Sequence, residues 1–249
     1  LGVSFGRHVV STGEAQLPAQ TGVTAFAANA GPRVGPVVIN EIHFHPSGTG
    51  AEFIEVLNMS GQAVDLFEPG HPERPWRLNG VGFDFPAGLT VPAGGLALVV
   101  PTEPAAFRAA HGLPPEALVF GPYSGNLQDS GERLELQRAE QTLLGLVYIT
   151  VDEVRYNDRA PWPVAGDGAG PSLNRASASA YGNDPANWLA VAPSPGALRS
   201  AQAPPVITSQ PRSRTILLSG QAAFSVEASG PGTVRYQWQF NGAPIAGAT

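Results

Sequence analysis

The chain lacks cysteine and lysine altogether, and it has one methionine among its 249 residues. Without cysteine it has no disulfide scaffold, no cysteine-ligated zinc and no thiol nucleophile. All 14 basic residues are arginine and 20 residues are acidic, so the net charge of -6 argues against a surface built to neutralise phosphates. No apolar run reaches the ~18 residues that a membrane-spanning helix needs. We therefore expect no nucleic-acid partner and no membrane span.

The composition is rich in turn-forming residues. There are 30 glycines and 25 prolines, and 43% of the residues are hydrophobic, which is typical of a folded chain with many short strands. The first residues, "LGVSFGRHVV", lack the charged segment and the long apolar core of a signal peptide. The chain starts with leucine, and its methionine is Met59. We interpret it as part of a longer multidomain protein, extracellular or at the cell surface, whose targeting signal lies upstream.

The chain resembles itself at one fixed spacing. "GVSFGR" at 2–7 is similar to "GPSLNR" at 170–175, and "AGPRVGPVVI", which ends at Ile39, is similar to "APPVI", which ends at Ile207. Both matches share one offset, because 172 minus 4 and 207 minus 39 each give 168. This favours tandem modules. It predicts four parts: 1–33 as the tail of a preceding module or a linker, 34–196 as a central module, 197–205 as a linker, and 206–249 as the start of another module. We expect residues 1–30 to pack little against the central module unless they supply a strand to it.

The central part alternates apolar and polar residues with the period of a β-strand. "VVINEIHFH" predicts a strand whose two faces are Val38, Asn40, Ile42 and Phe44, and Ile39, Glu41, His43 and His45. Further short apolar stretches, such as "EFIEVLN" and "LVYITVDEVRY", are separated by glycine, proline and asparagine. One helix is predicted over 102–112, with Thr102 as its N-cap and Gly112 at its end. The pattern indicates an all-β sandwich decorated by one surface helix.

Several motifs of the central part are informative as an ordered series. They are "VVINEIHFHP", "EFIEVLN", "AVDL", "WRLNG", "FDFPAG", "TVPAGGLALVV" and "DEVRYNDRAPWPVAGDGAGPSL". In this order they resemble the lamin tail domain family in its bacterial, secreted form. The resemblance implies an immunoglobulin-like β-sandwich that serves as a binding or structural module without enzymatic activity. The positions that match the family pattern are Asn40, Glu41, Glu52, Glu55, Asn58, Trp76 and Trp162. The chain departs from the pattern at "FEPGHPER", which separates Leu66 from Trp76.

The C-terminal part is predicted to form three strands, "VITSQP", "AAFSVEAS" and "VRYQWQFNG". Trp238 precedes an Asn-Gly turn and resembles the buried tryptophan of strand C in an immunoglobulin-like domain. On this interpretation 206–249 is a truncated immunoglobulin-like domain. We expect it to have unpaired strand edges and poor stability alone.

A metal site competes with a plain structural role for the polar face of the first strand. Glu41, His43 and His45 lie at alternate positions of one strand and could share a cation. Two histidines without a third are a weak motif, however, and a polar face is ordinary for a strand at the sheet surface. The structural role is the favoured hypothesis.

Paired carboxylates raise a second alternative. Glu41, Glu52 and Glu55 could supply an acid and a base, which requires an enclosed site that holds them at a suitable separation. The favoured interpretation is again structural: Glu41 or Glu55 pairs with Arg77 or Arg155, while asparagines such as Asn40 and Asn58 satisfy turn backbone.

Aromatic residues in loops are the better indication of binding. Tyr123, Tyr156, Trp162 and Trp188 lie in or beside glycine- and proline-rich loops, where a ring can stack on a sugar or anchor a protein partner. Rings in such loops also close the ends of sandwiches. Trp162, between two prolines, is predicted to be a mostly buried plug.

The sequence therefore predicts an immunoglobulin-like β-sandwich of the lamin-tail type, followed by a truncated second immunoglobulin-like domain. The predicted function is a non-catalytic binding or structural module, adhesive or spacing, that needs no cofactor and whose partner is a protein or a glycan. The alternatives are a metal-dependent hydrolase that uses Glu41, His43 and His45, and a carbohydrate-binding module.

Overall fold

The computed structural model describes residues 3–199, 206–215, 220–229, 234 and 236–248. The chain separates into two compact units, Leu1–Ala197 and Leu198–Thr249, and each is described by itself. The first unit ends beside the predicted end of the central module at residue 196. No helix in these described ranges is long and apolar enough to cross a membrane.

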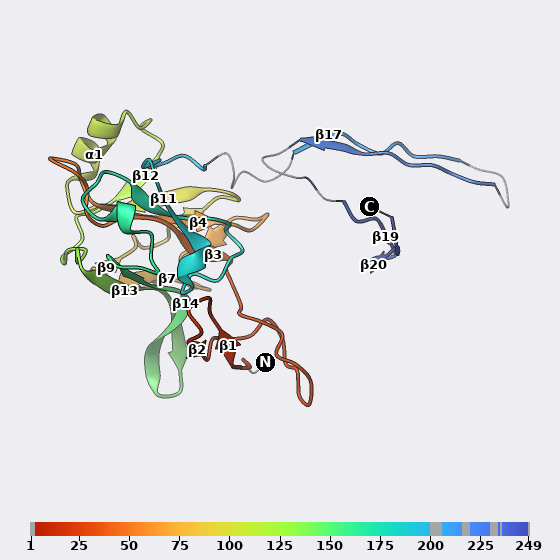
Figure 1. The fold of residues 1–249 in the computed structure, drawn as a ribbon, viewed down its shortest axis with the longest axis horizontal. Helices are drawn as coiled ribbons and strands as arrows, with labels where there is room; N and C mark the ends of the chain where they lie inside the picture. The colour runs from red at the N-terminus through yellow and green to blue at the C-terminus, as the bar shows by residue number, and fades with distance from the viewer. Residues whose placement is uncertain (1–2, 200–205, 216–219, 230–233, 235, 249) are drawn as a thin grey trace. The chain divides into compact units, whose positions relative to one another are not determined.

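Two β-sheets build the first unit (Figure 1). The larger sheet has six strands, in the order β12 (Leu118–Phe120), β11 (Leu96–Val99), β4 (Phe53–Asn58), β3 (Val37–His43), β15 (Ser172–Arg175) and β16 (Trp188–Val191). The smaller sheet has four, in the order β14 (Gly145–Asn157), β13 (Gly131–Thr142), β8 (Arg77–Asn79) and β9 (Phe83–Asp84). All neighbouring pairs in the two sheets are antiparallel except β11 and β12, which are parallel. The predicted all-β class is confirmed.

The main hydrophobic core lies between the two sheets. Each sheet directs alternate apolar side chains inward, and the core includes Ile39, Ile42, Ile54 and Val56 from the larger sheet and Leu78, Leu134, Leu136 and Val154 from the smaller one. All of these side chains are fully buried. Two sheets that share one apolar layer in this way form a sandwich-like fold.

Strand β3 does not keep the phase that its sequence predicts. Its register with β4 shifts between Ile39 and Glu41, where β3 contains a β-bulge. The core-facing residues are therefore Val37, Ile39, Ile42 and Phe44. The prediction was right for Ile42 and Phe44, after the bulge, and wrong for Val38 and Asn40, before it. A bulge adds one residue to one strand of a pair, so it reverses the face of every residue on one side of it.

One helix covers part of the outer face of the larger sheet. Helix α1 (Pro104–His111) has its N-cap at Glu103, one residue after the predicted Thr102, and ends at Gly112 in the left-handed conformation with φ 62°. Its Phe107 packs in a second apolar cluster with Phe53, Leu98, Val100 and Val119. The helix is therefore a packed part of the fold and not only a surface decoration.

The segment "FEPGHPER" at 67–74 forms a hairpin of its own. Strands β6 (Phe67–Glu68) and β7 (His71–Pro75) pair with each other. The Glu68 carboxylate accepts hydrogen bonds from Arg74 Nη1 (2.7 Å) and from the N–H of Gln141 on β13 (2.7 Å). This hairpin thus supports the part of β13 that continues past β8 into the β13–β14 arm, whose tip extends away from the sheets (Figure 1). Nearby, β5 (Val64–Asp65) pairs with β10 (Thr90–Val91).

The N-terminal segment contacts the sandwich. Strands β1 (His8–Val9) and β2 (Ala15–Gln16) form a hairpin whose Ser11 N–H donates to Asp184 (3.0 Å). Gln16 Oε1 accepts from the Tyr181 hydroxyl (2.9 Å), and Val10 is buried. The expectation that residues 1–30 pack little is wrong for this hairpin, because it shares polar contacts with the loop that holds the 3-10 turn η2 (Pro185–Asn187).

A second 3-10 turn, η1 (Val164–Gly166), precedes β15.

The second unit consists of short hairpins in its described part. Strand β17 (Val206–Ser209) pairs with β18 (Glu227–Ser229), and β19 (Gln239–Phe240) pairs with β20 (Ala243–Pro244). The predicted Asn-Gly turn is present, with φ 51° at Asn241 and φ 82° at Gly242. Trp238 contacts Phe224, with ring centroids 6.3 Å apart, but it is only partly buried, so the predicted core role is not realised.

Candidate functional site

Glu41 and Glu55 lie directly opposite each other on β3 and β4. Both are fully buried. Residues 194–196, here called the strap, bind to both: Glu41 accepts from the Ser194 N–H (2.9 Å) and hydroxyl (2.8 Å), and Glu55 accepts from the Gly196 N–H (2.7 Å). Ser172 on β15 also donates its hydroxyl to Glu41 (2.5 Å). The two carboxylates therefore fasten the segment that leaves the sandwich to the centre of the larger sheet.

Burial and the neighbouring Glu41 perturb the ionisation of Glu55. The pKa of Glu55 is raised to about 8, first by burial and also by the charge of Glu41, while hydrogen bonds from Asn40 Nδ2 (2.9 Å) and the Gly196 N–H oppose the rise. Glu55 therefore holds a proton at neutral pH. Neither glutamate lines the cavity described below, and the strap covers both. Their arrangement is that of a structural clamp, not of an open acid and base pair.

The predicted arginine partners of these glutamates lie elsewhere. Arg77 donates Nε to Gln137 (2.7 Å), and its guanidinium carbon lies 3.6 Å from the centroid of the Tyr148 ring. Arg155 is on β14, with its nearest carboxylate contact 4.0 Å away at Glu153. The pairing with Arg77 or Arg155 was wrong because these arginines belong to the smaller sheet.

The two histidines of the opening strand have separate surroundings. His43 is 6% exposed, its ring is edge-on to Phe53 with centroids 5.4 Å apart, and burial lowers its pKa. His45 lies at the end of the strand, where Nδ1 is 2.5 Å from Asp167 Oδ1, and this hydrogen bond raises its pKa. In the part of the chain that the structure describes, no three His, Asp or Glu side chains are placed to hold a metal ion. The alternative metal site of Glu41, His43 and His45 is thus not assembled.

Glu52 has a structural environment at one end of the sandwich. Its carboxylate accepts hydrogen bonds from the Tyr123 hydroxyl (2.6 Å) and from the Leu127 N–H (3.2 Å). Burial, followed by these contacts with Glu52, strongly raises the pKa of Tyr123, so its hydroxyl remains a donor. Glu52 thereby holds the loop between β12 and β13 in place.

Asn58 satisfies turn backbone, as predicted. Its amide Nδ2 donates to the carbonyls of Gln62 (2.7 Å), Val91 (3.0 Å) and Pro92 (2.9 Å), and its Oδ1 accepts from the Ser60 N–H (3.0 Å). Every side-chain atom that can bond is used. Trp76 is buried in the main core.

An ion pair that the sequence analysis missed joins the two sheets. Arg175 on β15 is fully buried and forms a charge-assisted hydrogen bond with Asp152 on β14. Asp152 also accepts from the Ile39 N–H on β3 (2.8 Å), and the Arg175 guanidinium carbon lies 5.3 Å from the Trp188 ring centroid. The sequence could have indicated that Asp152 is buried. Asp152 lies two positions before the inward-facing Val154 on the same strand, so both side chains lie on the same face.

The loop aromatics are mostly inside the molecule. Tyr123, Tyr156 and Trp188 are 5%, 1% and 2% exposed, and Trp162 is 7% exposed. The prediction that Trp162 is a buried plug is confirmed, and it packs against Trp188 with ring centroids 6.0 Å apart. Rings buried this deeply close the end of the sandwich, so stacking of a ligand on their open faces was a wrong expectation.

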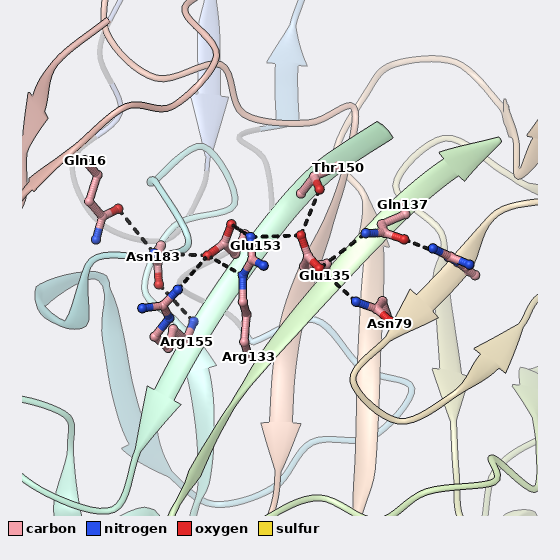
Figure 2. Close-up of polar contacts among 10 residues, drawn as sticks. Gln16, Asn79, Arg133, Glu135, Gln137, Thr150, Glu153, Arg155 and Asn183 are labelled. Atoms are coloured by element: carbon pink, nitrogen blue, oxygen red, sulfur yellow. Dashed lines mark hydrogen bonds and ion pairs between the residues drawn. The ribbon is translucent and has the colours of Figure 1, made fainter. Parts of the chain in front are cut away.

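The outer face of the smaller sheet carries a continuous set of polar side chains, here called the polar face (Figure 2). Arg133 and Arg155 lie directly opposite each other on β13 and β14, and so do Glu135 and Glu153. Arg133 donates Nε and Nη2 to Glu153 (3.0 and 2.9 Å), and its Nη2 is 3.0 Å from Glu135 Oε1. Like charges that face each other across the strands are thus neutralised along the diagonal.

Glu135 is the most enclosed member of the polar face. It accepts hydrogen bonds from Asn79 Nδ2 (2.8 Å), Gln137 Nε2 (3.3 Å) and the Thr150 hydroxyl (2.9 Å), as Figure 2 shows. With Arg133 added, four side chains on three strands converge on one carboxylate. Such a network specifies the strand register and leaves Glu135 no free acceptor for catalysis.

At one end the polar face continues into a groove beside the N-terminal hairpin. Asn183 Nδ2 links the two, donating to Gln16 Oε1 (3.2 Å) on the hairpin and to Glu153 Oε1 (3.5 Å) on β14. The groove has a volume of about 510 Å³. Its polar lining includes Thr12, Glu14, Gln16, Glu153, Arg155 and Asn183, and its apolar lining includes Leu17, Pro18, Pro161 and Trp162. The groove is open, mixed in polarity and large enough for a small ligand.

Comparison with known proteins gives no match for this chain: no family model, no curated protein and no solved structure is significantly similar to it.

Proposed function

We propose that the chain is a non-catalytic module of a larger extracellular protein, with the immunoglobulin-like sandwich of the lamin-tail type that its ordered motifs resemble. It acts as a spacer and as a binding unit. The observation that carries the proposal is the engagement of the candidate carboxylates: Glu41, Glu52 and Glu55 each hold backbone N–H groups of another segment. Their hydrogen bonds position a loop and the strap, so these carboxylates have a structural role.

The clamp on the strap supports the spacer role. The strap is the last segment before the boundary of the first unit at Ala197. Because Glu41 and Glu55 bind it to the two central strands of the larger sheet, the chain leaves the sandwich from one defined point. A defined exit is useful where successive modules must keep their spacing.

Metal and activity measurements on the purified chain test the proposal. We expect no stoichiometric zinc or manganese after incubation and dialysis, and no hydrolysis of chromogenic ester, phosphoester or glycoside substrates with either metal added. His43→Gln and His45→Ala should change neither result, with Arg138→Gln as a surface control. Stoichiometric metal that both histidine variants abolish, together with metal-dependent hydrolysis, would overturn the proposal in favour of the hydrolase.

A further inference from the structure

The groove beside the N-terminal hairpin is a built feature of the first unit. Its hairpin wall is fastened by the Tyr181–Gln16 hydrogen bond (2.9 Å), by the contact of Ser11 N–H with Asp184 (3.0 Å), and by the edge-on packing of His8 on the Tyr181 ring at 5.3 Å. Burial, followed by the charges of Glu153 and other acidic neighbours, raises the pKa of Tyr181 to about 12, so its hydroxyl keeps the proton that it donates. The groove is therefore preorganised for a ligand.

Two of its charged side chains have unused hydrogen-bonding capacity. Across the residues that the structure describes, the Glu14 carboxylate makes no hydrogen bond or ion pair. The Arg155 side chain is 63% exposed, and its one ion pair in the same ranges is the 4.0 Å contact with Glu153. One group comes from the hairpin and the other from β14, so a ligand in the groove meets an acceptor on one element and a fork of donors on the other.

The lining indicates the class of ligand. The charged groups are the carboxylates of Glu14 and Glu153 and the guanidinium of Arg155, which leave one net negative charge. This balance gives no excess of positive charge for phosphate, sulfate or a uronic acid. The polar groups on both walls would also lose hydration without replacement against a lipid or a fully apolar peptide.

A neutral sugar chain needs no excess of positive charge, and its hydroxyls can replace the water lost by the polar groups on both walls. Planar carboxylate, guanidinium and amide groups present paired acceptors or donors that match adjacent hydroxyls on a sugar ring. Leu17, Pro18 and Pro161 supply apolar contacts for the C–H face of the ring. We propose that the groove formed by the N-terminal hairpin, β14 and the 181–185 loop binds a neutral oligosaccharide, with Glu14 and Arg155 as its main hydrogen-bonding residues. This inference rests on the proposed function as a binding unit.

Isothermal titration of the whole chain tests it, with neutral hexaoses of glucose, xylose, mannose and N-acetylglucosamine as probes. Hexagalacturonate and a proline-rich decapeptide are the anionic and peptide comparators. We expect at least one neutral hexaose to bind, and Glu14→Gln and Arg155→Gln each to weaken it about tenfold, as for loss of one charge-assisted hydrogen bond. Leu17→Arg, at a position 71% exposed, should block the groove without removing a hydrogen bond.

Arg138→Gln and Glu140→Gln are matched controls, because these residues form an exposed ion pair (2.6 Å) on the β13–β14 arm outside the groove. Both should bind the hexaose like the parent chain, and all variants should keep the parent's thermal midpoint. Binding of none of the neutral hexaoses, preference for the galacturonate or the peptide, or an equal effect of the control variants would overturn the inference. Those results would contradict the sugar site but not the proposal that the chain is a non-catalytic module. Metal-dependent hydrolysis would contradict the non-catalytic module, and it would not test sugar binding in the groove.

Discussion

Two pairs of glutamates face each other across antiparallel strands, one pair in each sheet, and they are accommodated in opposite ways. Glu41 and Glu55 are fully buried under the strap and receive backbone and hydroxyl hydrogen bonds. Glu135 and Glu153 lie on the polar face, with Arg133 in contact with both. The pairs teach that a like-charge pair in a sheet is tolerated either by keeping a proton on one member or by sharing a cation. The segment that covers the sheet decides whether one glutamate keeps its proton or both share a cation.

The largest expected difference between the pairs is in the pH dependence of stability. The folded-state pKa of Glu55, about 8, exceeds its ordinary value of 4.5, so the unfolded chain gives up this proton at lower pH than the folded protein. The stability that Glu55 contributes is present below about pH 4.5, and it falls as the pH rises toward 8. We expect a loss on the order of 3 to 5 kcal/mol across this window, measured by urea unfolding at a series of pH values.

The Glu55→Gln variant isolates this effect from other titrating groups. Its free energy of unfolding should lack the decline, while the parent chain and Glu153→Gln should both retain it. Glu41→Gln should shift the upper end of the decline below pH 8, because the charge of Glu41 helps to raise the pKa of Glu55. A decline of the same size and position in Glu55→Gln would contradict the assignment.

Removal of Glu41 should have the next largest effect. Glu41→Ala leaves the donors of Ser172 and Ser194 without their acceptor in a buried site, so we expect about 3 kcal/mol of destabilisation. The strap should also come loose, which limited proteolysis around residues 194–199 would detect. Glu153→Ala is the comparison on the other sheet, and cleavage of the strap at the same rate in both variants would count against the clamp.

The smallest effect is expected for Arg133, the cation that Glu135 and Glu153 share on the polar face. Arg133 is 49% exposed, so Arg133→Ala should cost about 1 kcal/mol, from the loss of its network with Glu135 and Glu153. Arg138→Ala removes an arginine that is 42% exposed and has one partner, and should cost about 0.5 kcal/mol or less. Thermal unfolding at low and high salt measures both, and the difference should shrink as salt rises.

Local features followed from the sequence where local physics governs them. The helix ends at Gly112 in the left-handed conformation, the Asn241–Gly242 turn closes a hairpin, and Asn58 bonds to turn backbone. Each depends on the conformational freedom or the side-chain geometry of one or two residues.

Features that depend on two distant segments were not predictable. The bulge at Asn40 is defined by the register of β3 against β4, and it changed which residues face the core. The partners of Glu41 and Glu55 lie about 140 to 150 residues along the chain in the strap, so no spacing in the sequence indicated them. Arg175 and Asp152 likewise meet only because β15 and β14 belong to sheets that pack together.

The sequence by itself determined the all-β class, the turn positions and the absence of cysteine chemistry, because composition and residue periodicity act locally. Only the tertiary structure decided what the charged residues do. Whether a glutamate on a strand is a metal ligand, a catalytic group or a clamp depends on which segment covers its sheet and on how far that segment excludes water from the carboxylate. Here the strap covers Glu41 and Glu55, α1 packs over the face that His43 joins, and the N-terminal hairpin makes a groove beside Arg155.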